Sequence, residues 1–306
     1  MRGLEKEVKS TLTLPLRAQW VPPSPAKAVE GLSIPPFPSK RLAISWPQWA
    51  RKGEFMLGGK VVLITGASQG VGRGLALAAG SAGAAVVVTA RNVDAAEGVA
   101  DEIRAVGGKA VACRCDVTAR AEVEAAVAVA LAEFGRLDAL VHNATSRFTG
   151  KAIPLDKVTD ENWDDQVAVG LRGTYHCAQA SLAALTAAQG TFVILVSNVA
   201  HEGSLPLPVY TAVKGAQRGL VKALAREWGP QGVRVNAIAP VAMTPAMGTF
   251  FEARPEMRFY IESGAALRRV GDPEADIGPV LNFLVGPDSA FVTGQTLLVN
   301  GGATMI

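Results

Sequence analysis

The sequence predicts a three-layer α/β fold in which helices cover both faces of a doubly wound parallel sheet. From Lys60 onward, short apolar runs alternate with helical patterns, which is typical of parallel sheets. The first run, Val61–Ile64, is apolar at every position, as expected for a strand covered on both faces. A glycine-rich turn over residues 65–72 then opens a helix. A ligand is therefore expected at the carboxyl ends of the strands.

The remaining elements continue this alternation to the C-terminus. In the first half, each strand is a short apolar run and the last helix is rich in Ala and Glu. The predicted elements of this half are strands over 61–64, 85–89, 110–114 and 137–142 and helices over 73–82, 93–106 and 120–134. Those of the second half are helices near 162–188 and from Tyr210 to Trp228 and strands over 192–196, 234–238 and near 296–299.

Composition excludes several classes of protein. The chain has 306 residues, of which 49% are hydrophobic, so it can bury the core of one large domain. Its apolar runs stay well below the roughly 20 residues that span a bilayer. Residues 1–55 hold nine basic and four acidic residues, which leaves a net charge of −2 on residues 56–306. This part lacks the basic stripe of nucleic-acid-binding proteins.

Residues 1–55 differ from the rest of the chain. They contain eight of the eighteen prolines and no sustained period of 2 or 3.6 residues. We interpret them as an extended or disordered N-terminal extension, followed by one domain over residues 56–306. Met56, directly before the patterned domain, is a candidate for the natural start. The intact mass of the natively expressed protein would refute this hypothesis by showing the longer chain.

The turn over residues 65–72 has the context that a phosphate-binding glycine motif requires, between a strand and a helix. Its glycines let the backbone curl tightly and approach a pyrophosphate, whose charge the helix N-terminus favours. The spacing is Gly-x-x-x-Gly-x-Gly. The candidate cofactor-binding residues of this turn are Gly66, Ser68, Gln69, Gly70, Val71 and Gly72.

Tyr210 and Lys214 stand four residues apart in a segment that reads as helical, so both lie on one helix face. A neighbouring ammonium favours the phenolate and lowers the pKa of a tyrosine, so the pair suits acid/base chemistry. Together with Thr65-Gly-x-x-x-Gly-x-Gly, this Tyr-x-x-x-Lys pair resembles the short-chain dehydrogenase/reductase family. The resemblance covers about residues 57–306 and implies a Rossmann fold of one domain with a short substrate lid.

The end of the second predicted strand bears on the choice of cofactor. Relatives that prefer NAD usually carry an acid there, whereas this chain has Ala90 followed by Arg91. A guanidinium suits the 2′-phosphate, which favours NADP(H), with NAD(H) as the alternative. By resemblance, the further cofactor contacts are Asp116 and Val117 for adenine, Asn143 and Ala144 after the fourth strand, Pro240 and Thr244 near the nicotinamide, and Tyr210 and Lys214 themselves.

The family also has a serine that bonds the substrate oxygen. Ser197 stands thirteen residues before Tyr210, which is the family's spacing. Aligning Val196–Ala200 to the usual Ser-Ser-Val-Ala pattern instead puts Asn198 in the catalytic place. Either the Ser197 hydroxyl or the Asn198 amide can donate the bond. Both remain candidates, with a slight preference for Ser197.

Three other positions depart from the family pattern. Gly170 stands where an asparagine usually helps to hold a water, Val241 replaces a glycine, and Asn300 replaces an aspartate. Between the last two lies the predicted lid, whose apolar residues suit either a lipophilic substrate or core and oligomer packing. These residues are Met243, Met247, Phe250, Phe251, Met257, Phe259 and Tyr260.

The resemblance implies an enzyme that interconverts a carbonyl and a secondary alcohol, as an NADPH-dependent ketone or 3-oxoacyl reductase. In this reaction Tyr210 is the proton donor, and Lys214 lowers its pKa and bonds the nicotinamide ribose. Enoyl reduction is a further option, but those relatives commonly space Tyr and Lys more widely. The departures at Gly170, Asn198 and Val241 motivate a second hypothesis, a cofactor-binding sensor or scaffold with weakened catalysis.

The remaining expectations concern surroundings and partners. Three cysteines without a pairing pattern indicate a reducing compartment, the cytoplasm. His142, His176 and His201 share no ligand spacing, so we expect structural histidines and no metal. The resemblance implies a small-molecule carbonyl or alcohol substrate and a homo-oligomer, either a dimer or a tetramer.

Overall fold

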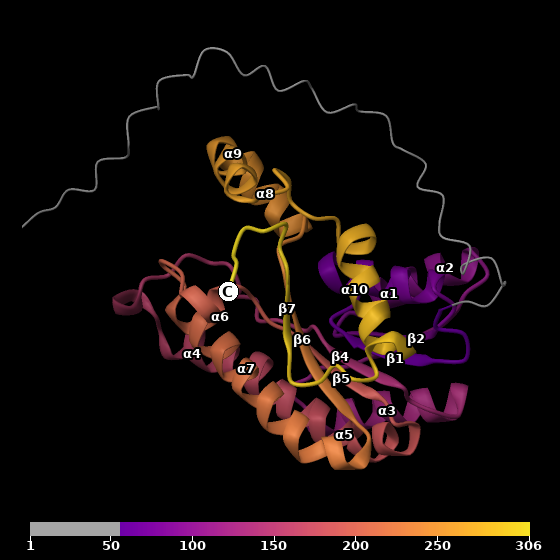
Figure 1. The fold of residues 1–306 in the computed structure, drawn as a ribbon. Helices are drawn as coiled ribbons and strands as arrows, with labels where there is room; N and C mark the ends of the chain where they lie inside the picture. Colours follow the sequence, from indigo (N-terminus) through magenta and orange to yellow (C-terminus); the bar gives the residue numbers. More distant parts are fainter. Residues whose placement is uncertain (1–55) are drawn as a thin grey trace, which may run out of the picture. The chain divides into compact units, whose positions relative to one another are not determined.

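One parallel sheet of seven strands organises the protein, as seen in a computed structural model that describes residues 56–306 (Figure 1). The predicted extension over residues 1–55 lies outside the described residues. The strand order is β3-β2-β1-β4-β5-β6-β7. The strands are β1 (Val61–Thr65), β2 (Ala85–Ala90), β3 (Lys109–Arg114), β4 (Ala139–His142), β5 (Thr191–Leu195), β6 (Arg234–Pro240) and β7 (Thr296–Val299). The predicted doubly wound α/β fold is confirmed.

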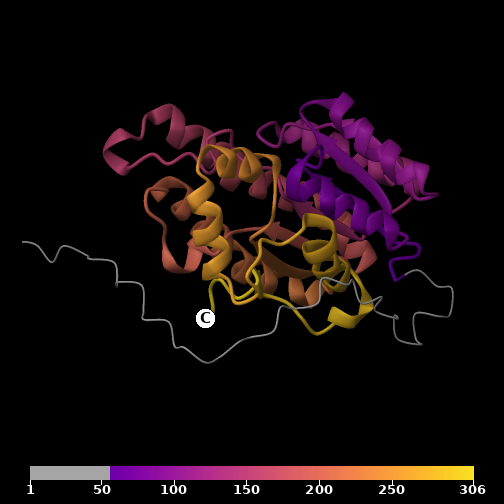
Figure 2. The same ribbon diagram turned by 90° about the horizontal axis from the view of Figure 1, so that it is seen from above.

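Helices cover both faces of this sheet (Figures 1 and 2). One face is packed by α1 (Gly70–Ser81), α2 (Val93–Ala105) and α10 (Gly278–Val285). The opposite face is packed by α3 (Arg120–Phe134), α5 (Gly173–Ala188) and α7 (Pro208–Trp228). Shorter helices lie at the edges: α4 (Asp160–Gln166), α6 (Val199–Glu202), α8 (Pro245–Ala253) and α9 (Pro255–Gly264), with 3-10 turns over 155–157, 229–231 and 287–289.

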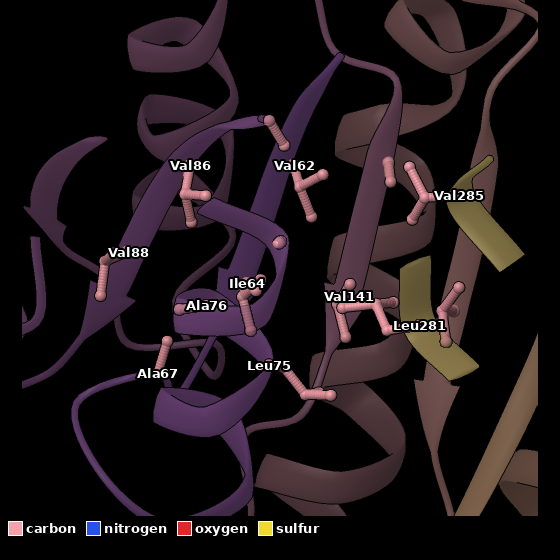
Figure 3. Close-up of a cluster of buried hydrophobic side chains, with 14 of the residues drawn as sticks. Val62, Ile64, Ala67, Leu75, Ala76, Val86, Val88, Val141, Leu281 and Val285 are labelled. Carbon is pink, nitrogen blue, oxygen red and sulfur yellow. The ribbon is translucent and has the colours of Figure 1, made fainter. Parts of the chain in front are cut away.

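The continuous apolar runs of the strands follow from this layering. In β1, Val62 and Ile64 join the core beneath α1 and α10, where Leu75 and Leu281 pack against them (Figure 3). Val61 and Leu63 point to the other core, beneath α3 and α5. Successive side chains of a strand alternate between faces, so a strand covered on both sides must be apolar at every position.

The helix predicted near 162–188 is found as one continuous helical stretch from Asp160 to Ala188, but it changes type in the middle. A π-helical segment, Val167–Arg172, separates α4 from α5, and a second one, Pro273–Ile277, precedes α10. Gly170 lies within the first segment, and a Cβ there would come 2.4 Å from Cγ1 of Val213 on α7. The glycine therefore lets α7 approach closely. Its carbonyl accepts hydrogen bonds from Thr174 Oγ1 (2.7 Å) and Gln217 Nε2 (3.1 Å).

The lid region was predicted only as an apolar cluster, whereas the structure forms α8 and α9 there. Both helices follow the carboxyl end of β6 and project beyond the sheet (Figure 1). Of the predicted apolar residues, only Phe251 is buried, while Phe259 and Tyr260 are 77% and 71% exposed. Core packing therefore does not explain these two aromatic side chains.

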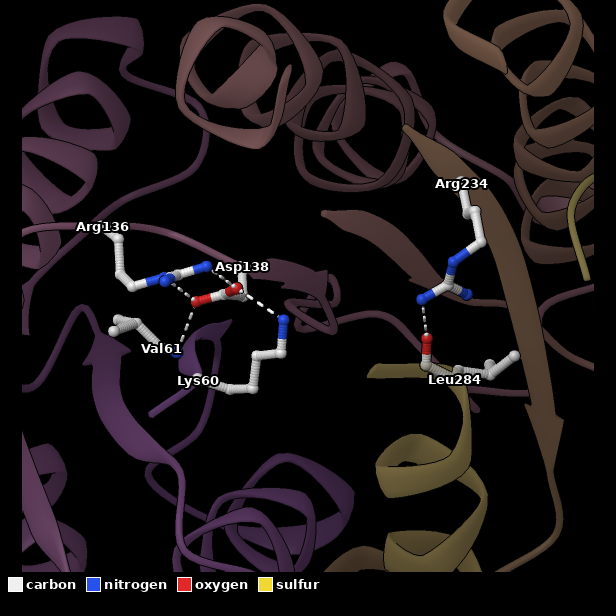
Figure 4. Close-up of polar contacts among 6 residues, drawn as sticks. All are labelled: Lys60, Val61, Arg136, Asp138, Arg234 and Leu284. Carbon is white, nitrogen blue, oxygen red and sulfur yellow. Dashed lines mark hydrogen bonds and ion pairs between the residues drawn. The ribbon is translucent and has the colours of Figure 1, made fainter. Parts of the chain in front are cut away.

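A buried carboxylate ties the strands together at the amino edge of the sheet (Figure 4). Asp138, directly before β4, is 2% exposed and accepts hydrogen bonds from Lys60 Nζ (3.0 Å) and the Val61 amide (3.0 Å). Arg136 donates two more bonds of 2.7 Å. Farther along the sheet, Arg234 donates to the Leu284 carbonyl oxygen (2.7 Å) and so joins β6 to α10. These contacts lie at the edge opposite the predicted site.

Within residues 56–306, no helix combines the length and the apolar character needed to cross a membrane.

Candidate active site

The glycine turn packs tightly between the ends of β1 and β4. Gly66 and Gly70 have φ angles of +64° and +56°, a region that favours glycine. A Cβ on Gly72 would come 2.4 Å from Asn143 Nδ2. The same amide nitrogen donates to the carbonyl oxygens of Thr65 (3.0 Å) and Gly66 (2.9 Å). The structure thus brings the predicted Asn143 against the turn.

The turn and the start of α1 fit a cofactor diphosphate. No side chain caps the first turn of this helix of 12 residues, and no acidic residue lies in it. Its free amide groups and the helix dipole therefore favour an anion. Thr244, the N-cap of α8, lies on the other side, with Cγ2 3.5 Å from where a Cβ of Gly70 would stand. The glycine turn and Thr244 thus lie on two sides of the expected cofactor site.

Arg91, predicted to select the cofactor, and Asp116 and Val117, predicted to contact adenine, gather at the neighbouring ends of β2 and β3. Arg91 is exposed directly after β2, and Val117 is buried two residues after Cys115. Burial raises the pKa of Asp116, but hydrogen bonds from Thr118 and the charges of Arg91 and Arg114 outweigh it and lower that pKa overall. A positive and a negative side chain therefore stand side by side at the expected adenosine end.

Tyr210 and Lys214 lie on the same face of α7, as predicted. Lys214 is buried, its Nζ donates to the Leu195 carbonyl oxygen (2.7 Å), and it lies 5.7 Å from the centroid of the Tyr210 ring. Burial raises the pKa of the Tyr210 phenol, and a hydrogen bond with Ser197 opposes this. The lowered pKa expected from Lys214 is thus not found, because burial dominates. At neutral pH the phenol is protonated, which is the form that donates a proton.

Burial lowers the pKa of Lys214 to about 7. In the unfolded chain the group titrates near ~10.4, so between these values the unfolded state binds more protons than the folded state. We therefore expect the free energy of unfolding to increase as the pH rises from about 7 to about 10, by up to ~1.4 kcal/mol per pH unit from this group. Urea denaturation of the cofactor-free protein across this range measures it. The control Lys214→Met should lose this part of the slope, and equal slopes for both proteins would contradict the prediction.

Ser197 and Asn198 have different surroundings. Ser197 is 8% exposed; its Oγ accepts a bond from the Val199 amide (3.4 Å) and donates to Asn198 Oδ1 (3.3 Å). It also lies close enough to the Tyr210 phenol to lower the pKa of that group. The donors of the Asn198 amide point elsewhere, to Glu202 Oε1 (2.7 Å) and to the Thr304 hydroxyl (3.1 Å). Ser197, Tyr210 and Lys214 thus form one cluster, and Asn198 stands behind it.

The histidines lie apart from this cluster or are buried beneath it. Burial and the nearby charge of Lys214 lower the pKa of His142 to about 3, so its ring is neutral. His176 Nδ1 bonds the Val117 carbonyl oxygen (2.9 Å). Over residues 56–306, no group of three or more His, Cys, Asp and Glu side chains is arranged to hold a metal ion.

Comparisons with known proteins agree with the fold. A family model described as Enoyl-(Acyl carrier protein) reductase matches residues 66–304. The chain is 35% identical over 251 residues to the 12alpha-hydroxysteroid dehydrogenase of a Clostridium species, covering 80% of this chain and 96% of that protein. It is 34% identical over 248 residues to the 7alpha-hydroxysteroid dehydrogenase of Escherichia coli, covering 80% and 94%.

A solved structure is also similar. It is a 7 alpha-hydroxysteroid dehydrogenase complexed with NADH and 7-oxo glycochenodeoxycholic acid, with a TM-score of 0.76, 33% identity, and coverage of 81% of this chain and 96% of that one.

The fold, the glycine turn and the Tyr–Lys pair define a nicotinamide-dependent oxidoreductase. The chain belongs to the short-chain dehydrogenase/reductase family. It is an enzyme that interconverts hydroxyl and carbonyl groups of small molecules with a nicotinamide cofactor. The hypothesis of a sensor or scaffold is not favoured, since the relatives described above are named dehydrogenases.

Proposed function

We propose that the protein is an NADPH-dependent reductase that converts a lipophilic ketone, or a 3-oxoacyl substrate, to a secondary alcohol. The observation that carries this proposal is the cluster of Ser197, Tyr210 and Lys214 at the carboxyl edge of the sheet, beside the glycine turn. Its phenol is protonated at neutral pH, which suits the direction of reduction.

Each side chain of the cluster has one role in this proposal. When bound, a nicotinamide cofactor would supply the hydride for the carbonyl carbon. Tyr210 gives its proton to the substrate oxygen as negative charge develops there, and the phenolate then regains a proton from solvent. Ser197 donates a hydrogen bond to the same oxygen. Lys214 bonds the cofactor ribose. The diphosphate is held by the glycine turn, through Gly66, Ser68, Gln69, Gly70, Val71 and Gly72. The adenosine half contacts Asp116, Val117, Asn143 and Ala144, and the nicotinamide contacts Pro240 and Thr244.

The preference for NADPH rests on Arg91. We expect Arg91→Asp to raise the KM for NADPH about 10- to 100-fold, because a charge-assisted bond to the 2′-phosphate is lost and a repulsive charge is added. The KM for NADH should stay the same or fall. Lys109→Asp makes the same charge change at the amino end of β3 and should leave both constants unchanged. Wild-type activity with NADH that equals or exceeds that with NADPH would refute the preference.

The substrate class is argued from the surface near the phenol. A small hollow beside Tyr210 includes the apolar side chains Ile153, Val158 and Leu207. Exposed aromatic residues of α9 stand in the predicted lid. The relatives are named for hydroxysteroids, which are also lipophilic.

Cofactor consumption over a panel of carbonyl compounds tests this proposal. The panel contains 7-oxo glycochenodeoxycholic acid, cyclohexanone and a 3-oxoacyl thioester, with direct measurement of NADPH binding beside it. Turnover of one or more of these compounds supports the proposal. Tight NADPH binding without any turnover would instead support a sensor.

We also propose a homo-oligomer, either a dimer or a tetramer. A groove of about 280 Å³ between α5 and α7 is lined partly by Tyr175, Leu182, Leu220 and Leu224. Tyr175 is 48% exposed. Apolar surface of this kind marks interaction sites, and a second copy of the chain would cover it. Light scattering that gives the mass of a monomer at micromolar concentration would contradict this.

The proposed compartment is the cytoplasm. Cys113, Cys115 and Cys177 are all free thiols in the structure, and unpaired cysteines suit a reducing environment. Fractionation of cells that express the untagged protein measures its location, and recovery in an oxidising compartment would overturn the proposal.

A further inference from the structure

The last residues of the chain fold back on themselves and present one side chain toward the active site. In the C-terminal tail, residues 300–306, Asn300 is 4% exposed. Its Oδ1 accepts a bond from the Gly302 amide (3.0 Å), and its Nδ2 donates to the Thr304 carbonyl oxygen (3.1 Å). The tight turn requires positive φ angles at Gly301 (+62°) and Gly302 (+77°), which glycine adopts without steric cost. The buried amide therefore fixes the place of Thr304.

Hydrogen bonds of the Thr304 side chain connect the C-terminal tail to the catalytic cluster. The Thr304 hydroxyl donates to Glu202 Oε1 (2.6 Å) and accepts from Asn198 Nδ2 (3.1 Å). Asn198 Nδ2 also donates to Glu202 (2.7 Å), and Asn198 Oδ1 accepts from the Ser197 hydroxyl (3.3 Å). Hydrogen bonds therefore connect the tail to Ser197. We call Asn198, Glu202, Asn300 and Thr304 the tail network.

Two departures from the family pattern meet in this network. Asn198 follows the serine, and Asn300 replaces the usual aspartate; both amides donate to Thr304. An aspartate at position 300 could only accept, so it would face the Thr304 carbonyl oxygen without a donor. The Glu202 carboxylate likewise only accepts, which directs the NH₂ group of Asn198 toward it and the amide oxygen toward Ser197.

We propose that the tail network positions the Ser197 hydroxyl for catalysis, so that Asn198, Glu202, Asn300 and Thr304 are positioning residues of the active site. This inference rests on the proposed function, in which Ser197 bonds the substrate oxygen. Ser197 lies at the start of a short loop and helix, and outside this network its Oγ has the Val199 amide and the Tyr210 phenol as partners. A side chain held by few contacts depends on each of them for its orientation.

The network also has a consequence for the proton donor. The Ser197 bond lowers the pKa of Tyr210 against the effect of burial. The Ser197 hydroxyl carries one proton, so donating it to Asn198 Oδ1 competes with donating it to the Tyr210 phenolate. A variant that releases Asn198 frees this proton for the phenolate and lowers the pKa of Tyr210. In a variant of the network, the alkaline limb of the profile of kcat/KM for reduction should therefore move to lower pH. A merely structural role of the tail would not move it.

Two variants test the network in the full-length protein with its cofactor. Asn300→Asp removes the donor to Thr304 with almost no change of shape, and Thr304→Val removes the hydroxyl. We expect each to lower kcat about three- to tenfold, as for the loss of one hydrogen bond, while the KM for NADPH stays unchanged. Thr304→Ser keeps the hydroxyl and should restore kcat. Met305→Ala, on the exposed neighbour, is the matched control and should match the wild type.

A double-mutant cycle separates this inference from the proposed function. If the network acts through Ser197, Thr304→Val should have no further effect in a Ser197→Ala background. Full activity of Ser197→Ala alone would overturn the proposed role of the serine. A large loss in Ser197→Ala, with wild-type kcat and pH profile in Thr304→Val and Asn300→Asp, would overturn the tail network alone. Additive losses in the double mutant would also overturn it.

Discussion

Tyr210→Phe is expected to lower kcat about 10²- to 10⁴-fold, because the substrate oxygen then loses the general acid that transfers a proton to it. A tyrosine phenol is protonated at neutral pH, and burial raises the pKa of Tyr210 further. Ser197 alone would still polarise the carbonyl, so the remaining rate need not be zero. The measurement is the initial rate of NADPH oxidation with a compound turned over by the wild type.

The same variant should leave cofactor binding almost unchanged. The aromatic ring remains beside Lys214, and the Lys214 bond to the Leu195 carbonyl oxygen does not involve the phenol oxygen. We therefore expect the dissociation constant for NADPH to stay within about twofold of the wild-type value. A Tyr210→Phe enzyme with near wild-type kcat would refute the role of Tyr210. A loss of NADPH binding would instead indicate a structural role.

Asp138→Ala is expected to destabilise the fold by about 2–4 kcal/mol. The substitution removes the acceptor of the buried Val61 amide and the partner of two cations at the start of β1 and β4. The cost stays below that of a fully buried ion pair, because the side chains of Lys60 and Arg136 are 35% and 45% exposed and regain water. Urea denaturation of the cofactor-free protein at neutral pH measures the change.

Asp156→Ala is the matched control for this measurement. Asp156 pairs with Lys157 on the surface, where both side chains are 73% exposed. Such pairs contribute little, so the expected change is within ~0.5 kcal/mol. Equal unfolding free energies for Asp138→Ala and the wild type would show that the buried carboxylate does not stabilise the sheet edge.

Local pattern was sufficient for most of the fold. The helix predicted over 120–134 is found as α3 with the same bounds, and the other strands and helices shift by a few residues at their ends. The exception near residue 167 has a physical cause. Apolar periodicity reports which residues face the core, and a π-helical segment changes the hydrogen bonding of the backbone without a distinct apolar pattern.

The part of the candidate site that consists of short sequence motifs could be predicted from the sequence. The glycine turn and the Tyr210–Lys214 pair are local spacings, so the sequence indicated them directly. The sequence left Ser197 and Asn198 as alternatives. Both side chains can donate a hydrogen bond, and the direction in which each side chain points cannot be read from the sequence. The residues missed were Glu202 and Thr304, and the replacement of an aspartate by Asn300 was the one signal near them.

The sequence by itself determined the family, the order of strands and helices, and the residues of the glycine turn and the Tyr–Lys pair. All of these depend on contacts within one element or one turn. Only the tertiary structure decided that the pKa of Tyr210 is raised rather than lowered, because that depends on how much protein surrounds the phenol. It also decided that Asn198 turns toward Thr304, 106 residues away in the chain, since a contact of that range exists only when the chain is folded.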